Sequence, residues 1–90
     1  MQAVITVLGK DMVGILAKVS TKCADSDANV LEVTQSVLQA DMFAMIMVVD
    51  ISKLKIEFSD FAAELEELGK SLGLSIHTMH EDIFNSMHRV

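Results

Sequence analysis

The 90-residue chain has no tryptophan, tyrosine or proline, one cysteine (Cys23) and one arginine (Arg89). A single cysteine excludes an internal disulfide and a Cys-x-x-Cys metal or redox site. No apolar run approaches the ~20 residues that a membrane-spanning helix needs. The first residues, MQAVITVLGKD, lack the basic region and the cleavage site of a signal peptide. These absences lead us to expect a cytoplasmic protein that has no membrane partner.

Basic residues are also scarce: 7 lysine and arginine residues stand against 13 aspartate and glutamate residues, which gives a formal net charge of −6. An acidic chain repels phosphate backbones, so no nucleic-acid partner is expected. RNA-recognition domains need basic and aromatic side chains on a sheet, and Phe43 is the one aromatic residue in the predicted strands. A small phosphatase needs an anion-binding arginine, yet Arg89 is the penultimate residue. We therefore expect no enzymatic activity.

The apolar residues that remain make up 51% of the chain, which is enough for one globular domain with its own core. Two amphipathic stripes predict helices and four β-rich runs predict strands. In chain order these are strand 3–8, helix 12–28, strand 30–39, strand 42–51, helix 58–72 and strand 74–80. The order β-α-β-β-α-β is typical of a ferredoxin-like α+β sandwich, in which a four-stranded antiparallel sheet carries two helices on one face.

The strand at 42–51 is apolar on both sides, whereas strand 30–39 alternates and is expected to be half-buried. Two helices can cover only one side of strand 42–51. The other side would expose an apolar patch that monomers rarely tolerate. A homodimer is one solution. The alternative is that the tail, residues 82–90, forms a short helix and folds back over the open side.

The stretch GKDMVG, residues 9–14, joins the first strand to the first helix and is the candidate binding site. Gly9 is expected to end the strand, with a positive φ permitted. Amide groups of residues 13–16 at a positive helix end suit a carboxylate, and Lys10 adds attraction. Asp11 can cap the helix or accept hydrogen bonds from an ammonium group. The stretch therefore suits a free amino acid, although a capped turn without a ligand is the simpler explanation from the residues alone, because helix starts of this kind are common.

Other candidate groups point to no cofactor, no metal and no catalytic residue. His77 and His80 are expected on opposite faces of the last strand, so they cannot share one ion without a bend. Cys23 falls in the apolar stripe of its helix, which predicts a buried and inert thiol.

The succession of a strand, GKDMVGIL, a helix, DANVLEV and an apolar hairpin strand resembles the ACT domain, a small regulatory module that often binds amino acids. The resemblance covers residues 2 to about 81, so we expect an ACT domain at 1–81 followed by a tail at 82–90. It is strongest to small stand-alone ACT-domain proteins of uncharacterised function and to the ACT halves of the glycine cleavage system transcriptional repressor. It implies the sheet order 4-1-3-2.

In ligand-binding members of the family, the ligand lies at the loop before the first helix, often between two subunits. The family's loop glycine matches Gly14, its polar loop position matches Asp11, and an asparagine that begins the second strand matches Asn29. The expected ligand-binding residues are Lys10, Asp11, Met12, Val13, Gly14, Ile15 and Asn29. The expected function is a homodimeric regulatory module that binds an amino acid and acts on a regulated protein. The alternative is a protein–protein interaction module without a small ligand.

Overall fold

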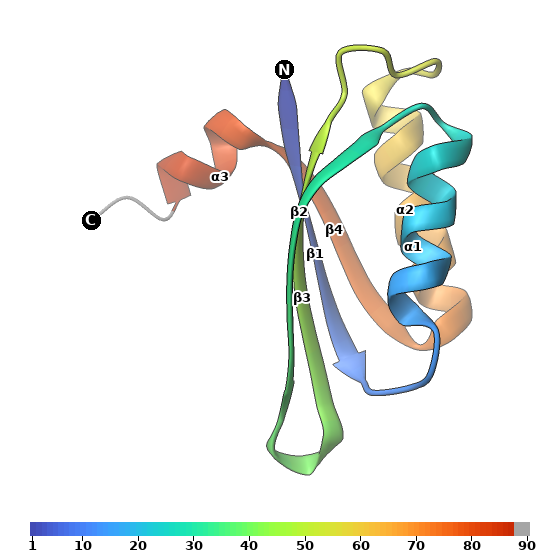
Figure 1. The fold of residues 1–90 in the computed structure, drawn as a ribbon, viewed down its shortest axis with the longest axis vertical. Helices are drawn as coiled ribbons and strands as arrows, with labels where there is room; N and C mark the ends of the chain where they lie inside the picture. Colours follow the sequence, from blue (N-terminus) through green and yellow to red (C-terminus); the bar gives the residue numbers. More distant parts are fainter. Residues whose placement is uncertain (88–90) are drawn as a thin grey trace.

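The computed structural model describes residues 1–87 of the chain. Its elements, in chain order, are β1 (Gln2–Lys10), α1 (Ile15–Asp25), β2 (Asn29–Leu38), a 3-10 turn (Gln39–Asp41), β3 (Met42–Asp50), α2 (Phe58–Leu72), β4 (Leu74–His80) and α3 (Glu81–Met87). The four strands form one antiparallel sheet in the order β2-β3-β1-β4 (Figure 1). The predicted α+β ferredoxin-like fold, with its sheet order 4-1-3-2, is therefore confirmed.

The core lies between the sheet and the helices α1 and α2, which cover the same face (Figure 1). Phe43, Met45, Met47 and Val49 on β3 are all buried in it, as the two-sided pattern of this strand predicted. Phe61 and Leu65 of α2 pack from above and are fully buried. Each such side chain stabilises the fold by roughly 1.5–3 kcal/mol relative to exposure to water.

Three local expectations were wrong. Gly9 does not end β1 with a positive φ, because it lies inside the strand, where a Cβ would come within 2.6 Å of Leu74 Cδ2. The first helix begins at Ile15 rather than at residue 12. The strand β2 is not half-buried: as an edge strand that has only β3 for a neighbour, it contains no buried residue.

The face of the sheet that α1 and α2 leave uncovered is called the open face. Register places Thr34, Ile46, Thr6 and His77 in one row across it, from β2 to β4. Ile46 remains 43% exposed, so the apolar surplus predicted for the third strand is present in the single chain.

The helix α3 leaves the sheet on the open side, near the ends of β1 and β4 (Figure 1). It contains no buried residue, and Ile83 and Met87 are more than half exposed. Residues 81–87 therefore cover only one end of the open face. They do not fold back over the whole face, as the alternative to a homodimer required. The last part of the predicted tail, residues 88–90, lies outside the described residues. Among residues 1–87, no helix is both long enough and apolar enough to cross a membrane.

Candidate functional site

The loop between β1 and α1 turns sharply at Gly14, which has φ 89° and ψ 11° in the left-handed region. Glycine adopts this conformation without steric cost. Gly14 is the N-cap of α1, but no side chain accepts a hydrogen bond from the first turn. The expected capping role of Asp11 is therefore wrong, because the glycine turn places the helix start four residues beyond it.

Asp11 is instead anchored through its backbone. Its N–H donates a 2.7 Å hydrogen bond to the carbonyl oxygen of Asp41, in the turn between β2 and β3. Ala40 and Asp41 in that turn both have positive φ, 61° and 58°. The loop before α1 and the hairpin turn are thus tied together at one end of the sheet.

A pocket of about 460 Å³ lies between this loop, the first turn of α1 and the edge of the sheet. It is lined by Asp11, Met12, Gly14, Ile15, Leu16, Ala17, Gln35, Ser36, Val37 and Phe43. Residues 14–17 are the helix positions whose N–H groups lack partners within the helix. The pocket therefore borders on four backbone donors at the positive end of the helix dipole.

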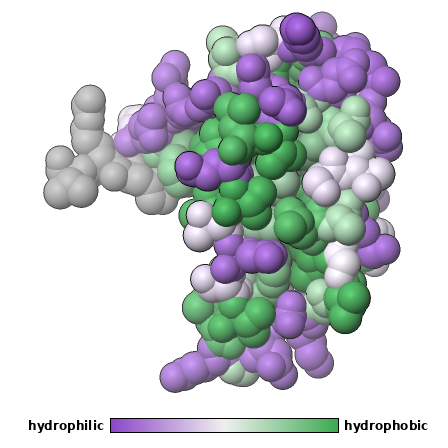
Figure 2. All heavy atoms as spheres, viewed as in Figure 1, coloured by the Kyte–Doolittle hydropathy of each residue, from purple (hydrophilic) through white to green (hydrophobic). Residues whose placement is uncertain are grey.

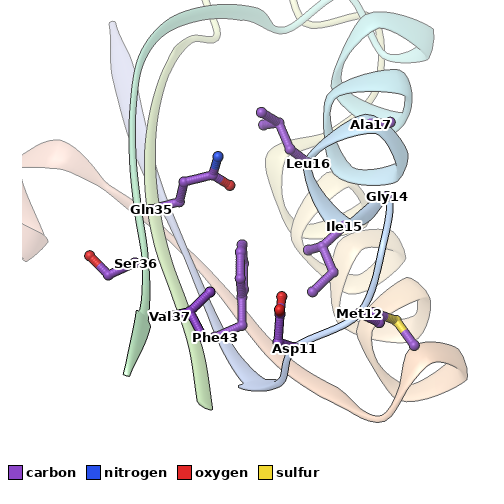
Figure 3. A pocket seen from close by; sticks show the side chains of 10 residues that line it. All are labelled: Asp11, Met12, Gly14, Ile15, Leu16, Ala17, Gln35, Ser36, Val37 and Phe43. Atoms are coloured by element: carbon purple, nitrogen blue, oxygen red, sulfur yellow. The ribbon is translucent and has the colours of Figure 1, made fainter. Parts of the chain in front are cut away.

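Figure 3 shows how polar and apolar groups divide this pocket. The carboxylate of Asp11 and the amide of Gln35 both point into the space between the sheet and α1, and the Phe43 ring lies between them. The Ser36 side chain points to the other side of β2, and Met12 points away from the space. One pocket thus combines backbone donors for an anion, a carboxylate for a cation and an aromatic wall.

Of the seven residues predicted to bind a ligand, the structure places Asp11, Met12, Gly14 and Ile15 at the pocket. Lys10 is the last residue of β1 and is paired with Met42, on the open face. Val13 is 98% exposed and does not line the pocket.

Asn29 lies far from the pocket. It pairs with Asp50, whereas Lys10 pairs with Met42, and these partners are eight residues apart on β3. Eight residues of strand span roughly 27 Å. Asn29 instead lines a separate hollow of about 480 Å³ with Asp27 and Lys53. One copy of the chain therefore cannot bring Asn29 and Asp11 to the same ligand.

Sequence reasoning missed Gln35, Val37 and Phe43, which form the sheet side of the pocket. Gln35 pairs with Met45, and Val37 pairs with Phe43, so all three lie on the face that the helices cover. The available signal was Gln35 itself, a polar residue in phase with Val33 and Val37. The register between β2 and β3 was needed to see that this phase faces α1.

The remaining candidate groups lie away from the pocket. Cys23 lies on the buried side of α1, and this burial raises the pKa of its thiol to about 11, so the thiol is protonated at neutral pH. His77 lies on the open face, whereas the His80 ring stacks on Phe58 of α2 at 4.1 Å between centroids. The prediction that the two histidines occupy opposite faces is confirmed.

Comparison with known proteins agrees with this architecture. The chain is 48% identical over 90 residues to a UPF0237 protein of Clostridium acetobutylicum, with all of both chains covered. Among solved structures, it is similar to an ACT domain protein from Streptococcus pneumoniae, with 39% identity, a TM-score of 0.81 and 93% of each chain covered.

A candidate glycine cleavage system transcriptional repressor matches with a TM-score of 0.73 and 21% identity, covering 86% of this chain and 43% of that one. At this identity, the likeness is one of fold. A family model described as the ACT domain matches residues 1–79. With the strand order and the glycine turn at the first helix, these matches show that the chain belongs to the ACT domain family.

Proposed function

We propose that the chain is a regulatory module that binds a free amino acid, or a similar small zwitterion, in the pocket before α1. The observation that carries the proposal is that Asp11, Gln35 and the first turn of α1 converge on one hollow of about 460 Å³. A zwitterion offers one negative and one positive group a short distance apart. The pocket offers the matching donors and acceptor.

In this proposal the ligand carboxylate accepts hydrogen bonds from the N–H groups of residues 14–17, where the helix dipole also favours negative charge. The ligand ammonium group donates to the carboxylate of Asp11, which points into the same space (Figure 3). Gln35 can donate and accept, so it suits a polar group on the ligand. Phe43 provides an apolar wall for the ligand's side chain.

The pocket opens beside β2, the edge strand, and this supports a homodimer that is formed through that edge. About every second residue of β2 directs its backbone N–H and C=O groups to the side with no neighbouring strand, and Leu31 and Val33 are exposed along it. Long unprotected edges of this kind readily pair with another chain. Figure 2, which has the view of Figure 1, shows apolar surface in the middle of the molecule and at the hairpin end.

Antiparallel pairing of two β2 strands about a two-fold axis sets the start of one strand beside the end of the other. Asn29 of the second copy would then lie near Val37, at the wall of the pocket. In this arrangement Asn29 of one copy and Asp11 of the other can contact the same ligand, whereas within one chain the two residues are roughly 27 Å apart. The ligand would bridge two copies and stabilise their pairing, and a regulated protein would respond to that pairing. The proposal keeps the cytoplasmic location expected from the sequence.

The direct test is a thermal-shift screen of the twenty amino acids at millimolar concentration. A ligand that binds only the folded state stabilises it by RT ln(1 + [L]/Kd), which is about 2.7 kcal/mol at a hundred times Kd. We expect at least one amino acid to raise Tm, and Asp11→Asn to reduce that shift. The matched control is Asp25→Asn at the far end of α1, which should keep it. A screen in which no amino acid moves Tm would refute ligand binding.

The edge pairing is tested separately with Leu31→Lys/Val33→Lys, since lysine on an edge strand opposes strand addition. We expect this variant to lose sedimentation mass and to bind the ligand more weakly. Thr21→Lys on α1 is the control. A variant that keeps the wild-type mass would argue against the edge dimer.

An interaction module without a small ligand is the second candidate function. The observation that favours it is the exposure of apolar side chains on the open face, Ile46 among them, on the side of the sheet opposite the helices. Native mass spectrometry of protein purified from cells separates the two functions, because it reports bound small molecules and bound proteins in one measurement.

A further inference from the structure

A groove of about 530 Å³ lies between α1 and α2, the two helices that cover the same face of the sheet (Figure 1). It shares only Ala17 with the pocket before α1, so it is a separate hollow on the helical side of the molecule. Its lining residues are Ala17, Lys18, Thr21, Lys22 and Asp25 of α1 and Leu68, Ser71 and Leu72 of α2.

The floor of this groove is apolar. Leu68 and Leu72 are partly buried and pack against the core, while Ala17 and Thr21 contribute only small side chains from α1. The aliphatic stem of a lysine also covers apolar surface while its ammonium group stays in water. A molecule that fills the groove therefore needs large apolar side chains of its own.

Two charges of opposite sign in this groove have no ion-pair partner. Lys18 and Asp25 are both exposed, and neither forms a salt bridge with any other part of residues 1–87. Lys22, which lies between them on α1, is paired with Glu64 of α2. Seven residues of helix separate Lys18 from Asp25, which is about 10.5 Å, or two turns. The two unpaired charges therefore give the groove a direction.

The spacing of these charges decides what kind of molecule matches them. A free amino acid cannot reach both, because its ammonium and carboxylate groups are attached to one carbon atom. A second helix can, because its side chains recur at the same rise per residue as those of α1. Laying the apolar face of an amphipathic helix in a groove is a common mode of protein recognition.

We propose that the groove between α1 and α2 binds an amphipathic helix of another protein. That helix carries leucine-like residues on one face, with an acidic and a basic residue about seven positions apart. The acidic residue pairs with Lys18 and the basic residue pairs with Asp25, so the helix binds in one direction only. The inference does not depend on an amino acid in the pocket, because the chain itself supplies all of the lining residues.

A second copy of the chain matches the groove less well. Of the large apolar side chains that are exposed in residues 1–87, none belongs to α1 or α2, so neither of these helices has an anchor for it. The helix α3 has such anchors in Ile83 and Met87, but it leaves the sheet on the open side, away from the groove (Figure 1). Placing α3 of one copy in the groove of the next is a head-to-tail contact that two copies do not close.

The test is a selection from a phage-displayed library of helical peptides about four turns long, with one face randomised and no amino acid added. We expect the selected peptides to share an apolar face and an acid–base pair about seven positions apart. The variant Lys18→Glu/Asp25→Lys keeps the net charge of the wild type and reverses the direction of the groove. Selected peptides should bind it roughly tenfold more weakly, and peptides with the acid and base exchanged should prefer it. The matched control is Lys10→Glu/Glu32→Lys on the open face, which should bind like the wild type.

A second measurement locates the bound peptide without any substitution. Methyl NMR spectra of the leucine-labelled wild type report separately on the groove and on the open face. We expect a selected peptide to shift the methyl signals of Leu68 and Leu72 and to leave those of Leu8, on the open face, unchanged.

Several results would overturn the proposal. They are a selection that enriches no helical peptide, equal binding to the wild type and to Lys18→Glu/Asp25→Lys, and methyl shifts at Leu8 in place of Leu68 and Leu72. Head-to-tail polymers of the wild type that dissociate in the charge-reversed variant would overturn it too, because a second copy would then occupy the groove. The amino-acid pocket fails separately, since a thermal-shift screen without a hit leaves peptide binding unchanged.

Discussion

Replacing Gly14 by alanine should destabilise the protein through backbone conformation alone. A Cβ at position 14 would meet no atom within 4 Å, so steric overlap with neighbours contributes nothing. The left-handed conformation at φ 89° remains, and it costs an L-residue about 1–2 kcal/mol. Alanine also restricts the unfolded chain, which offsets about 0.4–1 kcal/mol. The net loss is therefore about 1 kcal/mol.

For a domain of this size, about 1 kcal/mol lowers Tm by roughly 4–8 °C. Gly14→Asn is the matched variant, because asparagine tolerates the left-handed region better than alanine. We expect thermal unfolding to rank glycine above asparagine and asparagine above alanine. If Gly14→Ala unfolds at or above the temperature of Gly14→Asn, the turn at Gly14 does not have the conformation described here, and the positions of the pocket amides change with it.

Three further predictions concern stability. Burial raises the pKa of the Cys23 thiol from 9.0 to about 11, so the stability that the protonated thiol contributes is complete below pH 9 and is lost as the pH rises from 9 to 11. Denaturant titrations should show that the free energy of unfolding falls by about 1 kcal/mol between pH 8 and 10. The variant Cys23→Ala should lack this decrease. Ala40→Gly should raise Tm by several degrees, since Ala40 has φ 61°, and a lower Tm would refute strain in this turn. Gly69→Ala should lower Tm although alanine favours helices, because its Cβ would come within 2.8 Å of the Leu74 carbonyl oxygen and of Ile76 Cγ1; a rise in Tm would contradict this close packing of α2 on β4.

The sequence predicted the fold because local patterns and global architecture agree. The stripe from Phe58 to Leu72 coincides with α2, and Gly73 ends it in the left-handed conformation expected of a C-terminal glycine. The two-sided apolar pattern of residues 42–51 correctly gave both the buried and the exposed set of β3. These signals depend on the side-chain period within one element, which the sequence displays directly.

The errors arose where an outcome depended on a neighbouring element. Gly9 looked like the end of a strand, but it lies inside β1, and a side chain at this position would collide with Leu74 of β4. The alternation in β2 looked like half burial, yet β2 is an edge strand and none of its residues is buried. Gln35 joined the candidate site only once its pairing with Met45 was known. Spacing along the chain does not encode register between strands.

The backbone hydrogen bond from Asp11 to Asp41 joins the loop before α1 to the turn between β2 and β3. One end of it lies in the loop that borders the pocket, and the other lies in the turn that carries Leu38 and Met42. We therefore expect a molecule that binds in the pocket to restrain the turn as well. By thermodynamic linkage, a partner that binds at the turn then changes the affinity of the loop for its ligand. The factor is the same as that by which the ligand changes the affinity for the partner. Measuring ligand affinity across a dilution series would expose that reciprocity as a dependence on protein concentration.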